Sequence, residues 1–174
     1  MRQESIRFFS QGYLHEFLQH RIGRMNGYIE EQQRDYLLNV AESDFAEHVF
    51  ELFRLEPVNL LVGNQNIEEE PIQVDATDYR GISTRIKLPG QRLILRVPFE
   101  GDRELLKYSP SRGNTRGVLG QVISDNLCIE YEVADHNRES IPGRIKGDIN
   151  SLVDHCIYSK VDVERFNAEL ARPC

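Results

Sequence analysis

The chain has 174 residues, of which 40% are hydrophobic and 28% are charged, and this composition is ordinary for a folded globular protein. Its 21 Lys and Arg residues against 28 Asp and Glu residues give a net charge of −7, which argues against a general nucleic-acid coat protein. No stretch reaches the about 18 apolar residues of a transmembrane helix, and no apolar signal core follows the N-terminus. We therefore expect a cytoplasmic protein that forms one domain over residues 1–174, with no membrane contact.

The N-terminal part, residues 1–56, has the pattern of helices. Apolar residues recur there at steps of three or four positions, with one gap at Gln32, which predicts one long amphipathic helix: Leu14, Leu18, Ile22, Met25, Ile29 and Tyr36. A second helix is predicted after Ser43, a residue type that is favoured as an N-cap, and it should end before Pro57.

The central part, residues 57–135, has the pattern of strands. Weak strands are predicted around Ile72 and Ile86, and the Pro89-Gly90 pair predicts a turn that ends the second one. The next strand is clearer because apolar residues alternate along it and should share one face: Leu93, Leu95, Val97 and Phe99.

A reversal and a hairpin complete this central part. Gly101 permits the chain to reverse, and Asp102 is expected to cap a short helix over residues 103–108. Residues 118–123 and 127–133 read as a hairpin in which alternate residues of the second strand face the core: Leu127, Ile129, Tyr131 and Val133.

The C-terminal part, residues 138–171, returns to helix, with one stripe from Ile145 to Cys156 and a second, short helix from about Asp162. The order is helices, antiparallel strands and helices again. We therefore expect an α+β fold with a mostly antiparallel sheet of about five to seven strands flanked by N-terminal and C-terminal helices.

Positive charge is concentrated in one window of this acidic chain. Residues 80–116 hold nine Lys and Arg residues against three Asp and Glu residues, so the window is +6 and the remainder is −13. Arginine forks bind phosphate or carboxylate, and a tyrosine can stack on a base. The candidate anion-binding residues are Arg92, Arg96, Arg103, Lys107, Tyr108, Arg112 and Arg116. The alternative is that these cations pair with acids of the same chain, such as Glu130 and Glu132.

The patterns that usually carry catalysis are weak. The three cysteines, Cys128, Cys156 and Cys174, have no metal-binding spacing, and their odd number favours a reducing compartment. We expect Cys128 and Cys156 to be buried as small hydrophobic residues. Glu130 and Glu132 share a strand face and could bind the divalent cation of a nuclease, although position 134 is Ala where such a site would have Lys. We expect no catalytic residue, no cofactor and no metal.

One motif carries a resemblance. The run from Leu95 to Ser111, LRVPFEGDRELLKYSPS, resembles a VPFxGDxxLLxxxPS-type motif of uncharacterised bacterial proteins that are associated with defence. Residues 55–60, 126–131 and 162–170 are similar to further segments of the same proteins, in the same order. In larger relatives this region precedes an arginine-rich helical segment and a restriction-endonuclease-like domain. Leu106 replaces their usual Phe, and the chain ends at Cys174, so the nuclease half is expected on another chain or in a longer protein.

The favoured hypothesis is a non-catalytic recognition or regulatory module of a bacterial antiviral defence system, which binds nucleic acid or an acidic protein surface through the basic segment. The first alternative is a protein–protein interaction or oligomerisation scaffold, including a homodimer, built on the N-terminal helices with Tyr13, Phe17, Tyr28 and Tyr36. The second alternative is a metal-dependent nuclease that uses Glu130 and Glu132.

Overall fold

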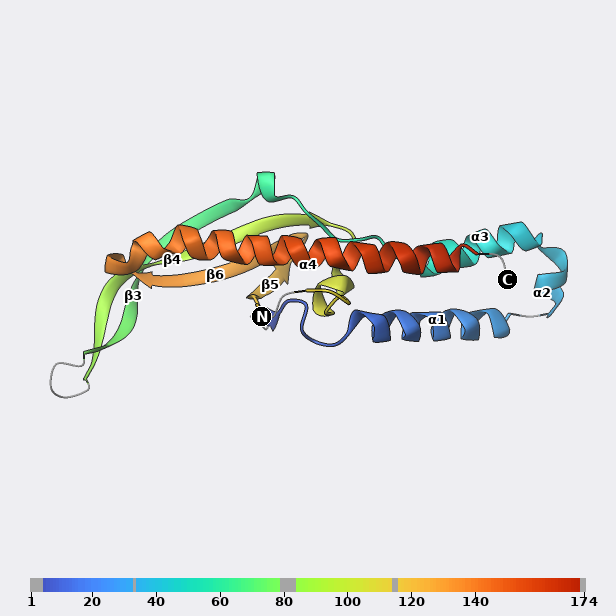
Figure 1. The fold of residues 1–174 in the computed structure, drawn as a ribbon, viewed down its shortest axis with the longest axis horizontal. Helices are drawn as coiled ribbons and strands as arrows, with labels where there is room; N and C mark the ends of the chain where they lie inside the picture. Colours follow the sequence, from blue (N-terminus) through green and yellow to red (C-terminus); the bar gives the residue numbers. More distant parts are fainter. Residues whose placement is uncertain (1–4, 33, 79–83, 114–115, 173–174) are drawn as a thin grey trace. The chain divides into compact units, whose positions relative to one another are not determined.

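A computed structural model describes residues 5–32, 34–78, 84–113 and 116–172 (Figure 1). Contacts within the chain define two compact units. Unit 1 comprises Met1–Arg7, Leu60–Glu100 and Val118–Val153, and unit 2 comprises Phe8–Asn59, Gly101–Gly117 and Asp154–Cys174. Helix α4 (Ile141–Leu170) begins in unit 1 and ends in unit 2. The prediction of one domain over residues 1–174 stays a prediction.

The sheet confirms the α+β prediction. Its strand order is β1 (Ile6–Arg7), β5 (Leu119–Ile123), β6 (Asn126–Ala134), β4 (Thr84–Glu100) and β2 (Asn59–Leu60), and β3 (Asn66–Asp78) pairs with β4. The pairs β1–β5, β5–β6, β4–β6 and β3–β4 are antiparallel. Short 3-10 helices η1 (Val62–Asn64) and η3 (Asp135–Ser140) precede β3 and α4.

The core of unit 1 lies on one face of β4 and β6. The residues predicted to face the core are all at most 6% exposed, which confirms the alternation: Leu93, Leu95, Val97, Phe99, Leu127, Ile129, Tyr131 and Val133. The first part of α4 contributes Ile141, Ile145 and Ile149 to this core. The Tyr131 hydroxyl donates a hydrogen bond to Asp148 over 2.8 Å, which fixes α4 on this face of the sheet.

The predicted turn at Pro89-Gly90 is wrong, because β4 continues through both residues to Glu100. Gly90 pairs with Ala134 of β6. A Cβ atom on Gly90 would lie 2.4 Å from the carbonyl oxygen of Val133. The glycine therefore allows two strands to approach closely, which is the other common use of glycine within a strand.

Unit 2 is built from helices. They are α1 (Leu14–Glu30), α2 (Arg34–Asn39), α3 (Glu42–Phe53), the 3-10 helix η2 (Arg103–Lys107) and the second part of α4. The long first helix that was expected to reach Tyr36 instead ends at Glu30, and Tyr36 belongs to α2. Ser43 is not an N-cap, because α3 begins at Glu42 and the capping position is Ala41.

The two predicted C-terminal helices form a single helix, α4. Its buried stripe continues without a break through Cys156, Ser159, Val163 and Phe166, none of them more than 5% exposed. The continuous spacing of three or four residues explains why the helix does not end before Asp162.

The side chain of Arg21, on α1, caps the C-terminus of α3. Its Nε donates a hydrogen bond of 2.6 Å to the carbonyl oxygen of Phe53, one of the carbonyls that a helix C-terminus leaves without a partner. Burial lowers the pKa of the Arg21 guanidinium. The contact ties α1 to α3 within unit 2.

The reversal at Gly101 is confirmed, since its φ of +98° lies in the region that glycine alone adopts readily. Asp102, however, makes no side-chain cap of η2. Its carboxylate accepts the backbone N–H of Glu56 over 2.7 Å, and its own N–H donates to the carbonyl of Glu56 over 2.9 Å. The Asp102 carboxylate therefore accepts a hydrogen bond from a chain segment 46 residues away, and not from the first turn of η2.

Candidate binding surfaces

The seven predicted anion-binding residues fall into both units. Arg92 and Arg96 lie on β4 in unit 1, and the other five lie in unit 2 between η2 and residue 116.

Arg92 makes three ion pairs with glutamates of the neighbouring strands. Its Nε lies 2.8 Å from Glu130, its Nη2 lies 2.9 Å from Glu132, and its Nη1 lies 2.5 Å from Glu70. Hydrogen bonds with Glu132 and Glu70 raise the pKa of Arg92. These three carboxylates come from β6 and β3, which flank β4 on either side.

Arg96 makes a bidentate pair with Glu68 of β3, with both nitrogen–oxygen distances at 3.2 Å. The hydrogen bond with Glu68 is also the main cause that raises the pKa of Arg96. The geometry of Arg92 and Arg96 thus favours the alternative that the sequence left open, in which cations pair with acids of the same chain. Two arginines face four glutamates, Glu68, Glu70, Glu130 and Glu132, and we name this set of six the charged ladder.

The basic residues of unit 2 have different surroundings. Arg103, Arg112 and Arg116 are exposed, and Lys107 pairs with Glu104 over 3.1 Å. The ring of Tyr108 stacks on Phe17 with centroids 4.5 Å apart, so a base could stack on that face only by displacing Phe17. Anion binding by this group stays a prediction.

Glu130 and Glu132, the two glutamates of the nuclease alternative, form ion pairs with Arg92. Glu130 and Glu132 are within 2.9 Å of its guanidinium nitrogens. Among the residues that the structure describes, no group of three or more His, Cys, Asp and Glu side chains is arranged to hold a metal ion. The geometry therefore gives no support to the nuclease alternative.

Cys156 and His155 are buried next to each other on α4, at 5% exposure each. Burial raises the pKa of the Cys156 thiol to about 12, and a protonated thiol is a poor nucleophile. His155 stacks on Phe9 with centroids 4.9 Å apart and an angle of 11° between the rings. The prediction that Cys128 and Cys156 are buried is confirmed.

A surface that the sequence interpretation missed lies on β3 and β4. Residues 72–78 of β3 pair with residues 84–90 of β4, and in the described sheet Gly90 is the last of these to pair with β6, through Ala134. We name this two-stranded part the ribbon. Its register is one-to-one, so alternate residues share a face. One face is aliphatic and half-buried: Ile72, Val74, Ala76, Ile86 and Leu88.

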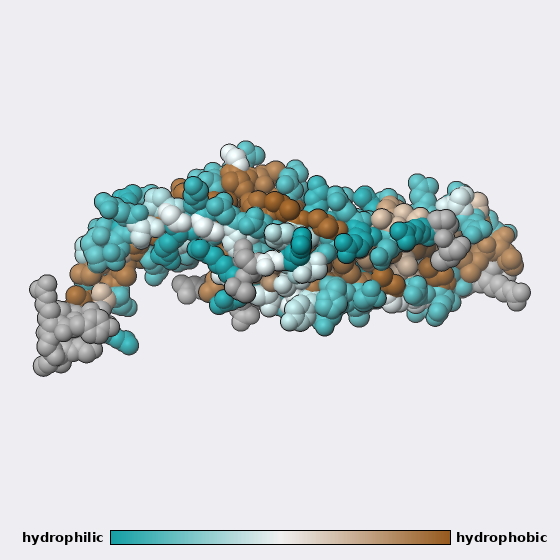
Figure 2. All heavy atoms as spheres, in the orientation of Figure 1, coloured by the Kyte–Doolittle hydropathy of each residue, from teal (hydrophilic) through white to brown (hydrophobic). Residues whose placement is uncertain are grey.

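The aliphatic face of the ribbon continues the charged ladder, because the ladder residues of β3 and β4 and the five aliphatic residues are all even-numbered and share one face of these strands. The polarity of the sheet therefore inverts at Ile72 and Gly90, with no inserted residue. In the ladder part, the opposite face packs against α4 through Leu93 and its neighbours, and in the ribbon that opposite face is polar, with Asp75 and Lys87 3.8 Å apart. Apolar atoms are visible on this part of β3 and β4 in Figure 2.

This inversion leaves a signal in the sequence. Glu68 and Glu70 share a parity with Ile72 and Val74, so one strand carries a charged half and an aliphatic half on the same face. The signal was hidden because the predicted turn at Pro89-Gly90 separated the two halves of β4.

Comparisons of the chain with protein-family models, with curated proteins and with solved structures found no match. Within the described ranges, no helix combines the length and the apolar character needed to cross a bilayer. The resemblance to the defence-associated proteins therefore rests on the motif residues alone.

Proposed function

We propose that this chain is a non-catalytic interaction module that self-associates through the aliphatic face of the ribbon. The observation that carries the proposal is the inversion of polarity at Ile72 and Gly90. It places five aliphatic side chains on the sheet face opposite to the one that α4 covers. An isolated two-stranded ribbon is at best marginally stable in water, so covering this face would stabilise it.

Charge favours a second copy as the occupant. The five aliphatic side chains carry no charge, so this part of the face can pack against the same part of a second copy, as a two-fold symmetric contact requires. Asp78, which has the same parity, is the last ribbon residue in the register and lies beyond them. A two-fold axis near Val74 and Leu88, which are paired across the ribbon, would carry the acidic ladders of the two copies to opposite ends. The outer edge of β3 is a poorer contact, because Glu68, Glu69, Glu70 and Pro71 discourage the addition of a strand.

The size of the face predicts a weak association. Seven residues per strand at about 3.3 Å each, on strands about 4.8 Å apart, give a face of roughly 23 by 10 Å. Two such faces bury much less than the about 1,200–2,000 Å² of a stable complex. We expect a dissociation constant on the order of 100 µM, which suits a contact that forms where the protein is concentrated.

Sedimentation velocity between about 10 and about 500 µM tests this proposal, since that range brackets the expected constant. The parent should show a sedimentation coefficient that rises with concentration. The double variant Val74→Thr/Leu88→Thr keeps strand-forming residues but should lose the rise. Gln73→Thr/Lys87→Thr changes the opposite face of the same two strands and should retain it.

Two results would overturn the proposal. One is a parent that stays monomeric over the whole range. The other is equal association of both double variants, which would move the contact to another surface or another occupant. Recognition of an anionic partner and a role in bacterial defence stay predictions, which the motif resemblance and the exposed Arg112 support.

A further inference from the structure

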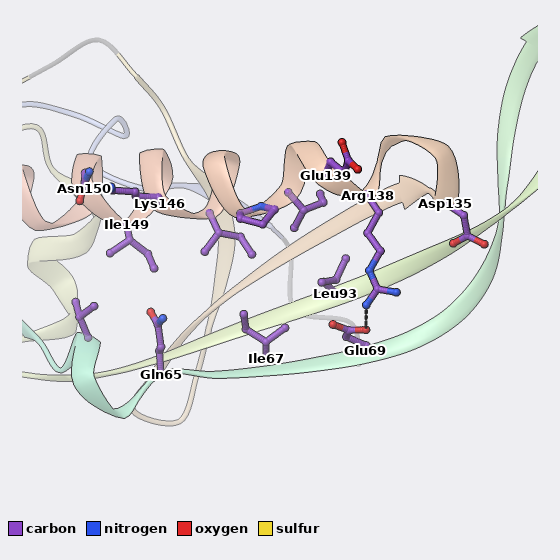
Figure 3. Close-up of a pocket in the computed structure, with 14 residues that line it drawn as sticks. Gln65, Ile67, Glu69, Leu93, Asp135, Arg138, Glu139, Lys146, Ile149 and Asn150 are labelled. Atoms are coloured by element: carbon purple, nitrogen blue, oxygen red, sulfur yellow. Dashed lines mark hydrogen bonds and ion pairs between the residues drawn. The ribbon is translucent and has the colours of Figure 1, made fainter.

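A groove in unit 1 runs between the first part of α4 and the sheet at β3 and β4 (Figure 3). Its volume is about 880 Å³, which is within the range of sites that enclose a small organic ligand. In Figure 3, Ile149 points from α4 towards the strands, and Ile67 and Leu93 point from the strands towards α4. Figure 2 shows apolar atoms gathered between η1 and α4, where the groove opens.

The lining of the groove is aliphatic. The apolar members of the 14 lining residues are Val62, Ile67, Leu93, Ile141, Pro142, Ile145 and Ile149, and no lining residue is aromatic. Walls of this kind offer no ring for a base or another planar ligand to stack on, but they pack well around a saturated chain. Ile67 is 40% exposed at this groove, so an aliphatic chain that covers it would remove apolar surface from water.

The two ends of the groove differ in charge. At one end, Arg138 Nη2 pairs with Glu69 over 2.8 Å, and Asp135 and Glu139 lie beside this neutralised pair. At the other end, Figure 3 shows Lys146 and Asn150 one turn apart on α4, with Gln65 below them. Cationic and amide donors therefore gather at one end, and surplus carboxylates gather at the other.

We propose that this groove binds one unbranched aliphatic chain that carries a terminal carboxylate. The chain lies between Ile67 and the isoleucines of α4. The carboxylate lies at Lys146 and Asn150, away from the acidic end, because only that end presents donors without a surplus of negative charge. This inference concerns a ligand site and does not rest on the ribbon contact.

Titration calorimetry with dodecanoate below its micelle concentration tests the site on the full chain. Dodecyltrimethylammonium, which has the same chain and a cationic head, is the comparison ligand. Vesicles of phosphatidylglycerol show whether a bilayer surface is preferred to a free chain. We expect saturable binding of one dodecanoate per chain and weaker binding of the cationic ligand.

Paired variants locate the site. Ile67→Trp should fill the groove and weaken dodecanoate binding at least about tenfold, which corresponds to about 1.4 kcal/mol. Ile123→Trp makes the same change at an equally exposed isoleucine outside the groove, with 39% against 40% exposure, and should bind like the parent. Lys146→Glu should weaken dodecanoate binding, whereas Lys160→Glu on the same helix should not.

Circular dichroism spectra confirm that each variant is folded before its affinity is compared. The proposal is overturned if dodecanoate does not bind, if Ile67→Trp and Ile123→Trp bind it equally, or if the cationic ligand binds as tightly. Binding to vesicles without binding of dodecanoate would also overturn it, because the surface would then recognise a bilayer and not a single chain.

Discussion

Replacing Gly101 with alanine should destabilise unit 2 severely. The residue has a φ of +98°, and a Cβ atom built on it would lie 2.3 Å from the carbonyl oxygen of Pro57 and 2.9 Å from the Cα of Val58. Both obstacles are backbone atoms, so no rotation of a side chain can relieve them. The same approach positions the reciprocal hydrogen bonds between Asp102 and Glu56, which a shift of the backbone would lengthen.

The cost has two parts. A non-glycine residue held at such a φ costs about 1–3 kcal/mol. Forcing an extra carbon into packed backbone costs a further about 1–3 kcal/mol. We therefore expect Gly101→Ala to lose about 2–6 kcal/mol, a large part of the about 5–15 kcal/mol that stabilises an ordinary folded protein. For a chain of this size about 1 kcal/mol corresponds to about 2–4 °C, so the melting temperature should fall by at least about 4 °C.

Thermal unfolding followed by circular dichroism measures this loss, and Gly27→Ala is the matched control. Gly27 lies within α1, and a Cβ atom there would meet no other atom within 4 Å. That substitution should stabilise the helix by up to about 1 kcal/mol, since alanine is the better helix former. If Gly101→Ala melted at the temperature of the parent, the close approach of residue 101 to Pro57 would be refuted.

Three further predictions concern other parts of the molecule. Because burial raises the pKa of Cys156 from 9.0 to about 12, only the unfolded state loses this proton between those pH values. The difference in the free energy of unfolding in urea between the parent and Cys156→Ala should therefore be constant below pH about 9. Above it, the parent should lose about 1.4 kcal/mol per pH unit relative to the variant, and a difference that stays constant with pH would contradict this. Asn167 accepts the N–H of Leu55 over 3.0 Å and donates to its carbonyl over 2.7 Å, so Asn167→Leu should lose about 1–3 kcal/mol in the same assay, and a loss below about 0.5 kcal/mol would contradict the paired contact. If the loop that holds Arg112 binds nucleic acid, Arg112→Ala should weaken binding of a labelled oligonucleotide and reduce the slope of log affinity against log salt concentration by about 1. Arg92→Gln should change neither, because the Arg92 side chain is already ion-paired. The reverse result would place the binding site on β4.

Strand alternation was predictable where one face is buried and the other is charged. Leu93, Leu95 and Val97 alternate with Arg92 and Arg96. Because apolar and charged residues alternate with a period of two, only one register places every apolar side chain on the buried face. The hairpin of β5 and β6 was predictable for the same reason, with its short polar turn at Ser124 and Asp125.

The helix ends and the turn at Pro89-Gly90 were not predictable, because distant segments decide them. Gly90 serves the approach of β6, and this role is visible only once Ala134 is known to pair with it. The C-terminus of α3 depends on Arg21, which lies about 30 residues earlier and is indistinguishable in the sequence from any other surface arginine. Local propensity carries no information on either contact.

The charge window of residues 80–116 shows how a linear pattern misleads about a surface. Arg92 and Arg96 contribute to its +6, yet the glutamates that pair with them are on β3 and β6, which lie outside that window. On the sheet the same residues therefore belong to a set with two cations and four anions. The window predicts where cations are in the chain, whereas the register decides which of them meet glutamates.

The ladder and the aliphatic face then have complementary effects on association. Two copies that met through their ladders would bring surplus negative charge together, which opposes contact along that part of the sheet. From Ile72 to Ala76 the residues of the same face are aliphatic, so apolar contact there meets no surplus of negative charge and is opposed mainly by the loss of freedom on binding. The point at which polarity inverts thus sets the boundary of the contact. Moving it by one pair, with Ile72→Glu, should weaken self-association more than the same substitution at Gln73, which lies on the polar face of the ribbon.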